Sequence, residues 1–294
     1  MKREQIKVGF CVAYDWYLLQ HSIPLIYEQA DIICLSVDAE RKSWAGNPFS
    51  WDEAGFRALV KQLDPQGKID VYEDDFHLPG LAPMQNEVRQ RKMIAERMGA
   101  GGWHIQLDTD EFFINFAGFV QHLHSLRPKR QLNVVCPWIT LYKQDTEGFY
   151  YVKPTTLENT EFIQIATLWP HYEYGRRNGY FNIYTDFAIL HLSWARSKEE
   201  IWEKLNNWGH KNDFDVPQYF KRWESLDTAN YREYRDFHHI QPAIWPQLGF
   251  IKAVSVEELM AKAKTEQLLP LSAAKLRLKN SIWVSRLKKI LKRN

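Results

Sequence analysis

Residues 103–113 read WHIQLDTDEFF, a short apolar segment followed by three acidic residues within four positions. The first five residues are typical of a buried strand, and Asp108 is the first residue past its expected end. Open α/β sheets bind their ligands outside the carboxyl ends of the strands, near the point where the strand order reverses. The segment therefore predicts a site at such an edge, built around Asp108, Asp110 and Glu111.

The sequence before this segment alternates between strand-like and helix-like stretches, which favours an α/β layer with a mostly parallel central sheet flanked by helices. In residues 84–98, apolar residues recur every three or four positions, and Arg91 shares their face of the expected helix. The second half is less regular. The other strands and helices are expected at 6–13, 14–29, 31–38, after the capping box at 50–53, and at 68–72, 133–142, 187–192 and 197–208. Another capping box, at 255–258, opens a short helix.

Composition places the chain among ordinary globular proteins. It has 294 residues, of which 45% are apolar and 25% charged, enough for one large or two small domains. The 38 Lys and Arg against 36 Asp and Glu give a net charge of +2, which provides no electrostatic basis for binding nucleic acid. Three cysteines in apolar runs argue against a disulfide framework. Without a signal-like core or about 20 uninterrupted apolar residues, we expect a cytoplasmic protein.

Two aspartates one residue apart in a turn can face a single site. Their hard oxygen ligands suit Mg²⁺ or Mn²⁺ that bridges phosphate groups. An arbitrary D-x-D pattern is more often a solvated acidic turn. Here the pattern follows a buried strand, and Asp38 closes an earlier one, which favours a site for a nucleotide diphosphate.

Several segments together resemble bacterial family 2 glycosyltransferases, which have the GT-A fold. They are VAYDWY at 12–17, Asp38, NEVRQRKMIAERMG at 86–99, WHIQLDTDEFF at 103–113 and LHLSWARSKEEIWEKLNNWGH at 190–210. The resemblance covers about residues 6–212. It implies sugar transfer from a nucleotide-sugar donor, UDP- or GDP-linked, with Mn²⁺ or Mg²⁺ at the D-x-D motif.

The resemblance also assigns roles by position. It implies that Asp108 contacts the ribose or the metal, that Asp110 is the principal metal ligand and that Asp38 recognises the nucleoside. His191 resembles the late histidine that completes the metal site in many members. The implied organisation is a nucleotide-sugar-binding half at 1–130, an acceptor-binding half of the same GT-A domain at 131–272, and a basic amphipathic tail at 273–294.

Charge on the departing diphosphate would be stabilised by the metal and by nearby cations, for which Arg89 and Arg91 are the candidates. These arginines would bind phosphate or give structural support to the acidic turn. The alternatives are a surface ion pair for Arg89 and, for Arg91, a snorkelling side chain on the helix face. An inverting enzyme also needs a carboxylate base. The Glu-Asp pair that often supplies it in family 2 does not occur after Asp110, so inversion and retention both stay open. By location, the remaining base candidates are Glu111, Glu173 and Asp186.

Aromatic residues make up 14% of the chain, and flat rings stack on sugars as well as filling cores. Trp169, Tyr172 and Arg176 belong to an aromatic and basic loop suited to an acceptor sugar or its phosphate. Trp194, Trp208 and His210 surround the LSW and NNWGH segments. Acceptor binding is predicted for Trp194, with core packing as the alternative.

The last 22 residues, 273–294, contain eight basic residues and no acidic one. Without them the chain has 30 basic against 36 acidic residues, a net charge of −6. Leu276, Trp283, Leu287 and Ile290 follow the spacing of a helix lying in a membrane interface. Contact with an anionic membrane on its cytoplasmic side would bring the enzyme to a lipid-linked acceptor. The alternative is a solubilising tail whose apolar stripe packs on the body.

Other function classes fit less well. A haloacid-dehalogenase-type phosphatase carries its D-x-D near the N-terminus and has Thr or Val where this chain has Phe112. A sugar nucleotidyltransferase needs a glycine-rich loop where this chain has Ala13-Tyr14-Asp15-Trp16. The sequence therefore predicts a metal-dependent glycosyltransferase of bacterial lipopolysaccharide or capsule synthesis, acting on a glycan or lipid-linked acceptor. The alternative is a non-catalytic carbohydrate-binding protein, which would not consume a donor.

Overall fold

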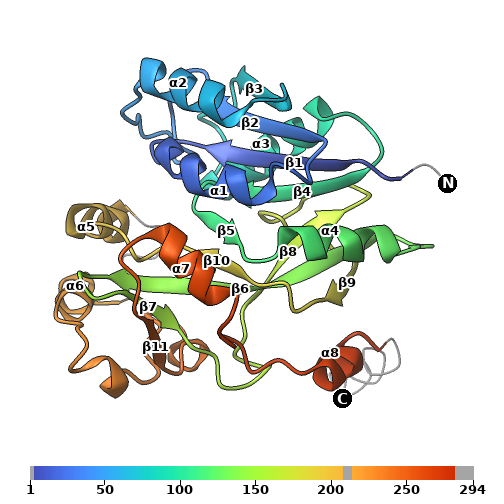
Figure 1. The fold of residues 1–294 in the computed structure, drawn as a ribbon. Helices are drawn as coiled ribbons and strands as arrows, with labels where there is room; N and C mark the ends of the chain where they lie inside the picture. Colours follow the sequence, from blue (N-terminus) through green and yellow to red (C-terminus); the bar gives the residue numbers. More distant parts are fainter. Residues whose placement is uncertain (1–2, 208–213, 282–294) are drawn as a thin grey trace. The chain divides into compact units, whose positions relative to one another are not determined.

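The structure, a computed structural model, describes residues 3–207 and 214–281 (Figure 1). Two compact units share the chain: Met1–Cys136 with Phe162–Phe187, and Pro137–Glu161 with Ala188–Asn294. The chain therefore returns to its first unit after residue 161. This division differs from the boundary at 130 that the resemblance implies, and the roles assigned to the two halves stay predictions.

A mostly parallel sheet forms the centre of the first unit. Its strand order is β8-β4-β1-β2-β3, with β8 antiparallel to β4 and the other neighbours parallel. These strands are β1 (Ile6–Val12), β2 (Ile32–Asp38), β3 (Ile69–Asp74), β4 (Trp103–Asp108) and β8 (Phe162–Thr167). From β1 the chain adds β2 and β3 on one side and then returns to place β4 on the other. The strand order therefore reverses between β1 and β4.

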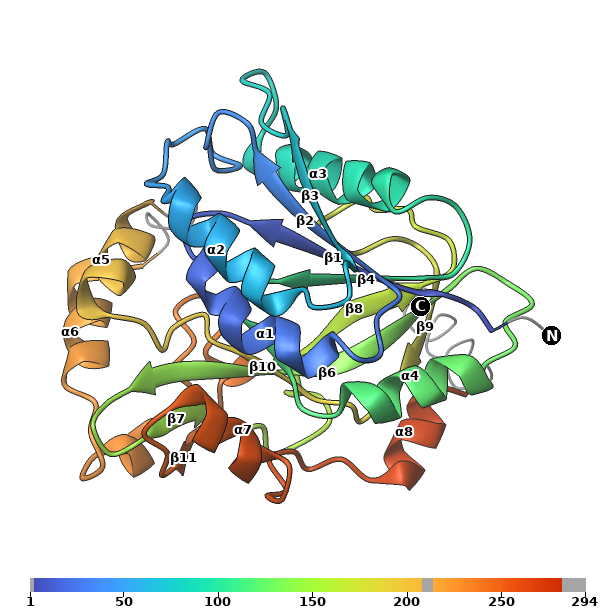
Figure 2. The same ribbon diagram turned by 45° about the horizontal axis from the view of Figure 1, so that its top comes forward.

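Helices cover both faces of this sheet. Figure 2 shows α1 (Leu19–Ile26) and α2 (Glu53–Leu63) on one face and α3 (Pro83–Arg97) on the other. A 3-10 turn at Trp16–Leu18 precedes α1. Asp52 caps α2 by accepting from the backbone N–H of Gly55 at 3.0 Å, two residues after the expected cap Ser50. The unit also includes β5 (Glu111–Phe113), α4 (Phe116–Ser125), the start of β6 (Leu132–Gln144) and β9 (Phe181–Tyr184).

Polar side chains hold α3 on the sheet. Gln90 donates from Nε2 to the hydroxyl of Ser36 at 2.8 Å, and Gln106 donates from Nε2 to the carbonyl of Arg91 at 3.3 Å. Lys7 donates from Nζ to the carbonyl of Gly99 just after the helix, at 2.7 Å. These bonds supply the partners that buried polar groups require.

Strand β1 packs tightly against α3 at Gly9. A Cβ atom at this position would lie 2.3 Å from Cγ2 of Ile94 and 3.3 Å from Cε of Met98. The absence of a side chain on this strand residue therefore lets the helix pack directly against the sheet.

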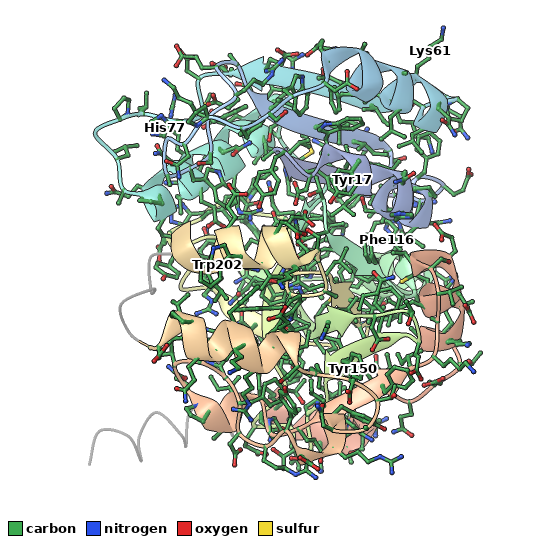
Figure 3. All side chains as sticks on the ribbon, turned by 90° about the vertical axis from the view of Figure 1, so that its left-hand side faces the viewer. Tyr17, Lys61, His77, Phe116, Tyr150 and Trp202 are labelled. Atoms are coloured by element: carbon green, nitrogen blue, oxygen red, sulfur yellow. The ribbon has the colours of Figure 1, made fainter. Side chains whose placement is uncertain are left out.

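The second unit combines the rest of β6 with antiparallel neighbours β7 (Phe149–Val152) and β11 (Leu248–Ile251), and with the parallel strand β10 (Ile189–His191). Its helices are α5 (Lys198–Asn207), α6 (Val216–Glu224), η2 (Tyr231–Glu233), η3 (Pro242–Ile244), α7 (Val256–Ala263) and α8 (Ala273–Lys279). Trp202 of α5, which Figure 3 labels, belongs to this unit. Its ring centroid lies 4.8 Å from that of Phe220 of α6.

The core of this unit is aromatic. Trp194 is 4% exposed and packs with Tyr142, Tyr219 and Trp245. The enclosure of its ring by other rings favours core packing, the alternative given to this residue, and acceptor binding by Trp194 stays a prediction.

Part of the C-terminal tail is described, as α8. Leu276 of this helix is 8% exposed and Leu278 is 62% exposed, so the first packs against protein and the second faces solvent. Trp283, Leu287 and Ile290 lie outside the described residues, as do Trp208 and His210. Within residues 3–207 and 214–281, no helix is both long and apolar enough to cross a membrane.

Candidate functional site

The candidate site lies at the carboxyl edge of β1 and β4. These parallel strands are neighbours, and Cys11 is paired in register with Asp108. Asp108 is the last residue of β4, so the strand ends one residue later than the sequence predicts. The loops that begin at Ala13 and Thr109 start at the reversal of strand order, which is where open α/β sheets bind ligands.

Two arginines hold the Asp108 carboxylate. Arg91 of α3 donates from Nη2 to Oδ1 at 2.9 Å, and Arg176 donates from Nη2 to Oδ2 at 2.7 Å. Arg91 is 1% exposed and Arg176 is 5% exposed. Both guanidiniums therefore support the acidic turn in this structure. The donor contact of Arg91 and the acceptor contact of Arg176 stay predictions.

The ion pairs continue in both directions from Asp108. Arg91 also pairs with Glu87 at 2.9 Å, and Arg176 pairs with Glu111 at 2.8 Å. The other carboxylate oxygen of Glu111 accepts from the backbone N–H of Asp108 at 3.0 Å. Glu87, Arg91, Asp108, Arg176 and Glu111 thus form one chain of alternating charges, which we call the acidic-turn network.

Electrostatics within the acidic-turn network favour the charged forms. Burial by itself would raise the pKa of Asp108, but the positive charges of Arg176 and Arg91 hold this pKa below its ordinary value. Burial likewise opposes the charge of Arg91, and Asp108 and Glu87 outweigh it and raise the Arg91 pKa. Removing one member would leave a buried charge without its counterion, which is strongly destabilising.

Asp110 lies in the turn between β4 and β5 and is 6% exposed. Its charge acts on Asp108 by raising the pKa of that carboxyl, so the two carboxylates are close. Two carboxylates this close repel each other, and a divalent cation beside them would offset that repulsion.

The fit of Mg²⁺ or Mn²⁺ depends on which ligands the chain offers. Among residues 3–207 and 214–281, no three His, Cys, Asp or Glu side chains come together as a ready-made metal cage. Both oxygens of Asp108 already accept from arginine. At phosphate-binding sites such ions need only one or two carboxylates, because phosphate and water supply the rest. Asp110 suits a site in which the protein supplies one carboxylate ligand. Asp108, which accepts from two arginines, would support the turn that carries Asp110.

His191 ends β10 in the second unit. Its ring stacks on Trp138, with centroids 4.0 Å apart and planes 14° apart. In the parallel register of β10 and β6, His191 is paired with Thr140. Its role as a metal ligand stays a prediction.

Asp38 has a different role from the one implied by resemblance. Oδ1 accepts from the backbone N–H groups of Glu40 and Lys42 at 3.1 and 3.0 Å. Oδ2 accepts from those of Phe76 and His77 at 3.1 and 3.0 Å. A carboxylate has about four acceptor positions, and these four bonds occupy them. Asp38 therefore ties the loops after β2 and β3 together, and recognition of a nucleoside by its carboxylate is not supported.

The three base candidates lie in different surroundings. Glu111 is 1% exposed and paired with Arg176, so it cannot take a proton from an acceptor in this structure. Glu173 is exposed and contacts His171 at 3.1 Å. Asp186 is exposed and follows β9. Only the last two remain accessible carboxylates.

Arg89 and Glu173 come together away from the acidic turn. Both line a surface pocket of about 400 Å³ beside α3, and its eight described lining residues include none from 108–111. Arg89 also donates from Nη2 to the carbonyl of Asp75 at 2.9 Å. Arg89 therefore lies at this surface pocket, and the arginine of α3 that bonds to the Asp108 carboxylate is Arg91.

The aromatic residues of the loop after β8 differ in exposure. Tyr172 is 3% exposed and packs with Val88 and Ala95 of α3, which favours a role in the core, and its acceptor contact stays a prediction. Trp169 is half-buried and stays a candidate. The exposed aromatic residue of this loop is Tyr174, which is 59% exposed.

Sequence reasoning missed an aromatic cluster that begins in the loop after β1. Tyr14 is 53% exposed and its ring meets Phe49 edge-on, with centroids 6.5 Å apart. Trp51 contacts Phe49 at 6.1 Å and Trp16 at 6.2 Å. The aromatic residues in VAYDWY, at 12–17, could have indicated this cluster. An exposed ring at the switch-point edge can stack on a nucleobase.

A second missed feature is a pocket of about 570 Å³ in the second unit. Lys221 and Arg222 of α6 line it together with Phe214, Tyr219 and His239. The ring of His239 lies 5.1 Å from that of Phe214 and 5.7 Å from that of Tyr219. Aromatic rings beside two cations suit a sugar that carries an acidic group.

Comparisons with known proteins identify no family. The sequence matches no protein-family profile and no curated protein sequence. Among solved structures, the chain is similar to a mannose-1-phosphate geranyltransferase from Thermus thermophilus, with 8% identity and a TM-score of 0.25. The match covers 76% of this chain and 65% of that one, less than two thirds of its length.

Proposed function

We propose that this chain is a glycosyltransferase that moves a sugar from a nucleotide-diphosphate donor to a glycan or lipid-linked acceptor in bacterial surface-polysaccharide synthesis. The observation that carries this proposal is the acidic turn at the reversal of strand order. Asp108 ends β4 beside β1, is held there by Arg91 and Arg176, and is followed by Asp110. This is the edge at which an α/β sheet binds a nucleotide.

In this proposal the chain's own residues divide the work of donor binding. Tyr14 stacks on the nucleobase, with Phe49 and Trp51 supporting its loop. Asp110 binds the cation, Mn²⁺ or Mg²⁺, that accompanies the diphosphate. When bound, such an ion stabilises the negative charge that develops on the leaving phosphate oxygens. Asp108 orients the turn and is not itself a required metal ligand.

The acceptor contributes the hydroxyl that replaces the diphosphate at the anomeric carbon. We place its binding on the second unit, with the 570 Å³ pocket as the candidate site for an acidic sugar. Trp169 is the remaining candidate from the loop after β8. The carbohydrate-binding alternative loses support, because Trp194 and Tyr172 are buried core residues.

Peripheral membrane attachment would suit a lipid-linked acceptor. Lys275, Arg277 and Lys279 of α8 place basic charge at the start of the tail, and buried Leu276 favours packing on protein at that position. Co-sedimentation with anionic liposomes, with and without residues 273–294, distinguishes the two roles of the tail. Equal sedimentation of both forms would contradict attachment through the tail.

The decisive experiment is a thermal-shift comparison of UDP, GDP, CDP and dTDP, each with and without Mn²⁺. A ligand at about 100 times its Kd adds about 2.7 kcal/mol to the free energy of unfolding. We expect one nucleotide to stabilise the protein in a Mn²⁺-dependent manner, and Asp110→Ala to weaken that effect. Glu158→Ala, which removes an exposed carboxylate outside the acidic turn, is the matched control. Stabilisation by none of the four nucleotides would contradict the proposal.

A further inference from the structure

The pocket beside α3 lies on the first unit. All but one of its described lining residues belong to α3, from Met84 to Glu96, and the remaining one is Glu173. Glu173 begins a tight hairpin at residues 173–177, in which its backbone N–H donates to the carbonyl of Arg177 at 2.9 Å. The pocket volume of about 400 Å³ falls within the roughly 300–1,000 Å³ that is usual for small-molecule sites.

Two cations in this pocket have hydrogen-bond donors to spare. Arg89 donates from Nη2 to the carbonyl of Asp75 at 2.9 Å, and no other hydrogen bond of its five N–H groups is found among the described residues. Its Nε–H is almost closed off from water and has no acceptor there. Lys92 is exposed, and its ammonium group forms no hydrogen bond or ion pair within the described part of the chain. An anionic group in the pocket would supply the missing acceptors.

Two carboxylates line the same pocket. The Glu173 side chain is 60% exposed, and its Oε1 lies 3.1 Å from Nε2 of His171. Glu96 is exposed, and its carboxylate has no hydrogen bond or ion pair with any other residue that the structure describes. With Arg89 and Lys92, the lining therefore carries two charges of each sign. A ligand of one charge would meet both attraction and repulsion there, whereas a ligand with one group of each sign would be complementary.

The opposite charges come from different elements. Arg89 and Lys92 belong to α3, whereas Glu173 belongs to the 173–177 hairpin. The rest of the lining is largely apolar and includes Met84, Val88 and Met93. Methionine side chains are flexible and adapt to the shape of a bound group. The pocket therefore suits a ligand in which a short apolar stem joins an anionic group to a cationic one.

We propose that this pocket binds a small zwitterion, whose anionic group accepts from Arg89 and Lys92 and whose ammonium group donates to Glu173. The anionic group is a phosphodiester or a carboxylate, since both present paired oxygens to a guanidinium. No residue of 108–111 lines the pocket, so this site is separate from the acidic turn and does not depend on the proposed function.

The test measures the affinity of four small probes by ligand-observed nuclear magnetic resonance, with no nucleotide present. Glycerophosphoethanolamine and 4-aminobutyrate are zwitterions that carry a phosphodiester and a carboxylate, respectively. Dimethyl phosphate carries an anionic group alone, and ethanolamine an ammonium group alone. We expect one zwitterion to bind about tenfold or more tightly than either single-charge probe, because a second charged hydrogen bond contributes that much. The zwitterion that binds more tightly identifies the anionic group.

Substitutions assign the two ends of the ligand. Arg89→Met and Glu173→Gln should each weaken binding of the preferred zwitterion by roughly 10- to 100-fold, since each removes one charged partner. Lys61→Met removes an exposed cation from α2, on the opposite face of the sheet (Figure 2), and should leave binding unchanged. Lys92→Met covers the case in which Arg89→Met does not fold, because the exposed Lys92 ammonium has no bond to lose. It should weaken binding by about threefold or more.

The inference is overturned if neither zwitterion binds, or if dimethyl phosphate or ethanolamine binds as tightly as the zwitterions. Unchanged binding by a folded Arg89→Met or Glu173→Gln protein would overturn it too, because the probe would then lie elsewhere. If Arg89→Met does not fold, unchanged binding by Lys92→Met has the same meaning. Since the assay contains no nucleotide, failure of the proposed function would leave these outcomes unaffected.

Discussion

Arg91 and Asp108 form a 2.9 Å ion pair between α3 and the end of β4, and the Arg91 side chain is only 2% exposed. A guanidinium this deeply buried depends on its counterions, because the charge has lost its hydration. The ion pair therefore contributes to the stability of the first unit and also fixes the position of the acidic turn.

We expect Asp108→Asn to lower the free energy of unfolding by about 3–5 kcal/mol, because it leaves two buried guanidiniums with a neutral partner. Urea denaturation measures this loss. Asp70→Asn is the matched control, since Asp70 pairs with Arg97 on the surface, where the side chains are 39% and 50% exposed. That change should cost less than about 1 kcal/mol. Equal effects of the two variants would contradict the importance given to burial.

Tyr14 provides a test of nucleobase stacking. Tyr14→Ala should weaken nucleotide binding by about 1–3 kcal/mol, the usual contribution of one aromatic ring stacked on a base. Isothermal titration with the stabilising nucleotide measures this change, and Tyr14→Phe should retain most of the affinity. Tyr174→Ala removes a similarly exposed ring from the 173–177 hairpin and should leave base binding unaltered. If Tyr14→Ala binds the nucleotide as tightly as the wild type, the aromatic cluster is not part of the donor site.

The contact between Gly9 and α3 predicts a specific pair of substitutions. Gly9→Ala would place a Cβ 2.3 Å from Cγ2 of Ile94, so we expect a loss of about 1–3 kcal/mol from overpacking. Ile94→Leu removes that Cγ2 branch, and in the double variant it should recover part of the loss. Thermal unfolding of the two single variants and the double variant checks this coupling. Strictly additive effects would show that the two residues do not compete for space.

His104 predicts a dependence of stability on pH. Burial, with a smaller effect of Lys7, lowers the pKa of His104 from 6.5 to about 4. In the unfolded chain the His104 imidazole therefore binds a proton below about pH 6.5, whereas in the folded chain it binds one only below about pH 4. The stabilisation is present above pH 6.5 and is lost as the pH falls toward 4, by about 3 kcal/mol in total. Between pH 7 and pH 5, His104→Gln should show a smaller fall in the free energy of unfolding than the wild type.

Sequence patterns predicted most of the elements that position the site. β1, β2, β4 and α3 lie within a few residues of their expected ranges, because apolar runs and a three-to-four residue period are local properties. The same period correctly placed Arg91 on the inner face of its helix. The partners of Arg91 were not predictable in this way, since Asp108 is 17 residues away in the sequence.

Three predicted site residues have partners within the protein that the sequence did not indicate. Arg176, Tyr172 and Asp38 are polar or amphipathic side chains of types that bind ligands, and composition alone does not show whether protein groups satisfy them. Arg176 meets carboxylates 68 and 65 residues away. Asp38 meets backbone N–H groups whose direction depends on two loop conformations. Such long-range pairings appear only once the chain is folded.

The polar contacts between α3 and the sheet have a mechanical consequence. Hydrocarbon surfaces tolerate sliding and rotation, because hydrophobic attraction has no direction. The amide of Gln90, bonded to Ser36, and that of Gln106, bonded to the Arg91 carbonyl, permit only a narrow range of helix rotation. While both amides keep these hydrogen bonds, rotation of α3 about its axis is restricted. The Arg91 guanidinium is therefore held near the end of β4.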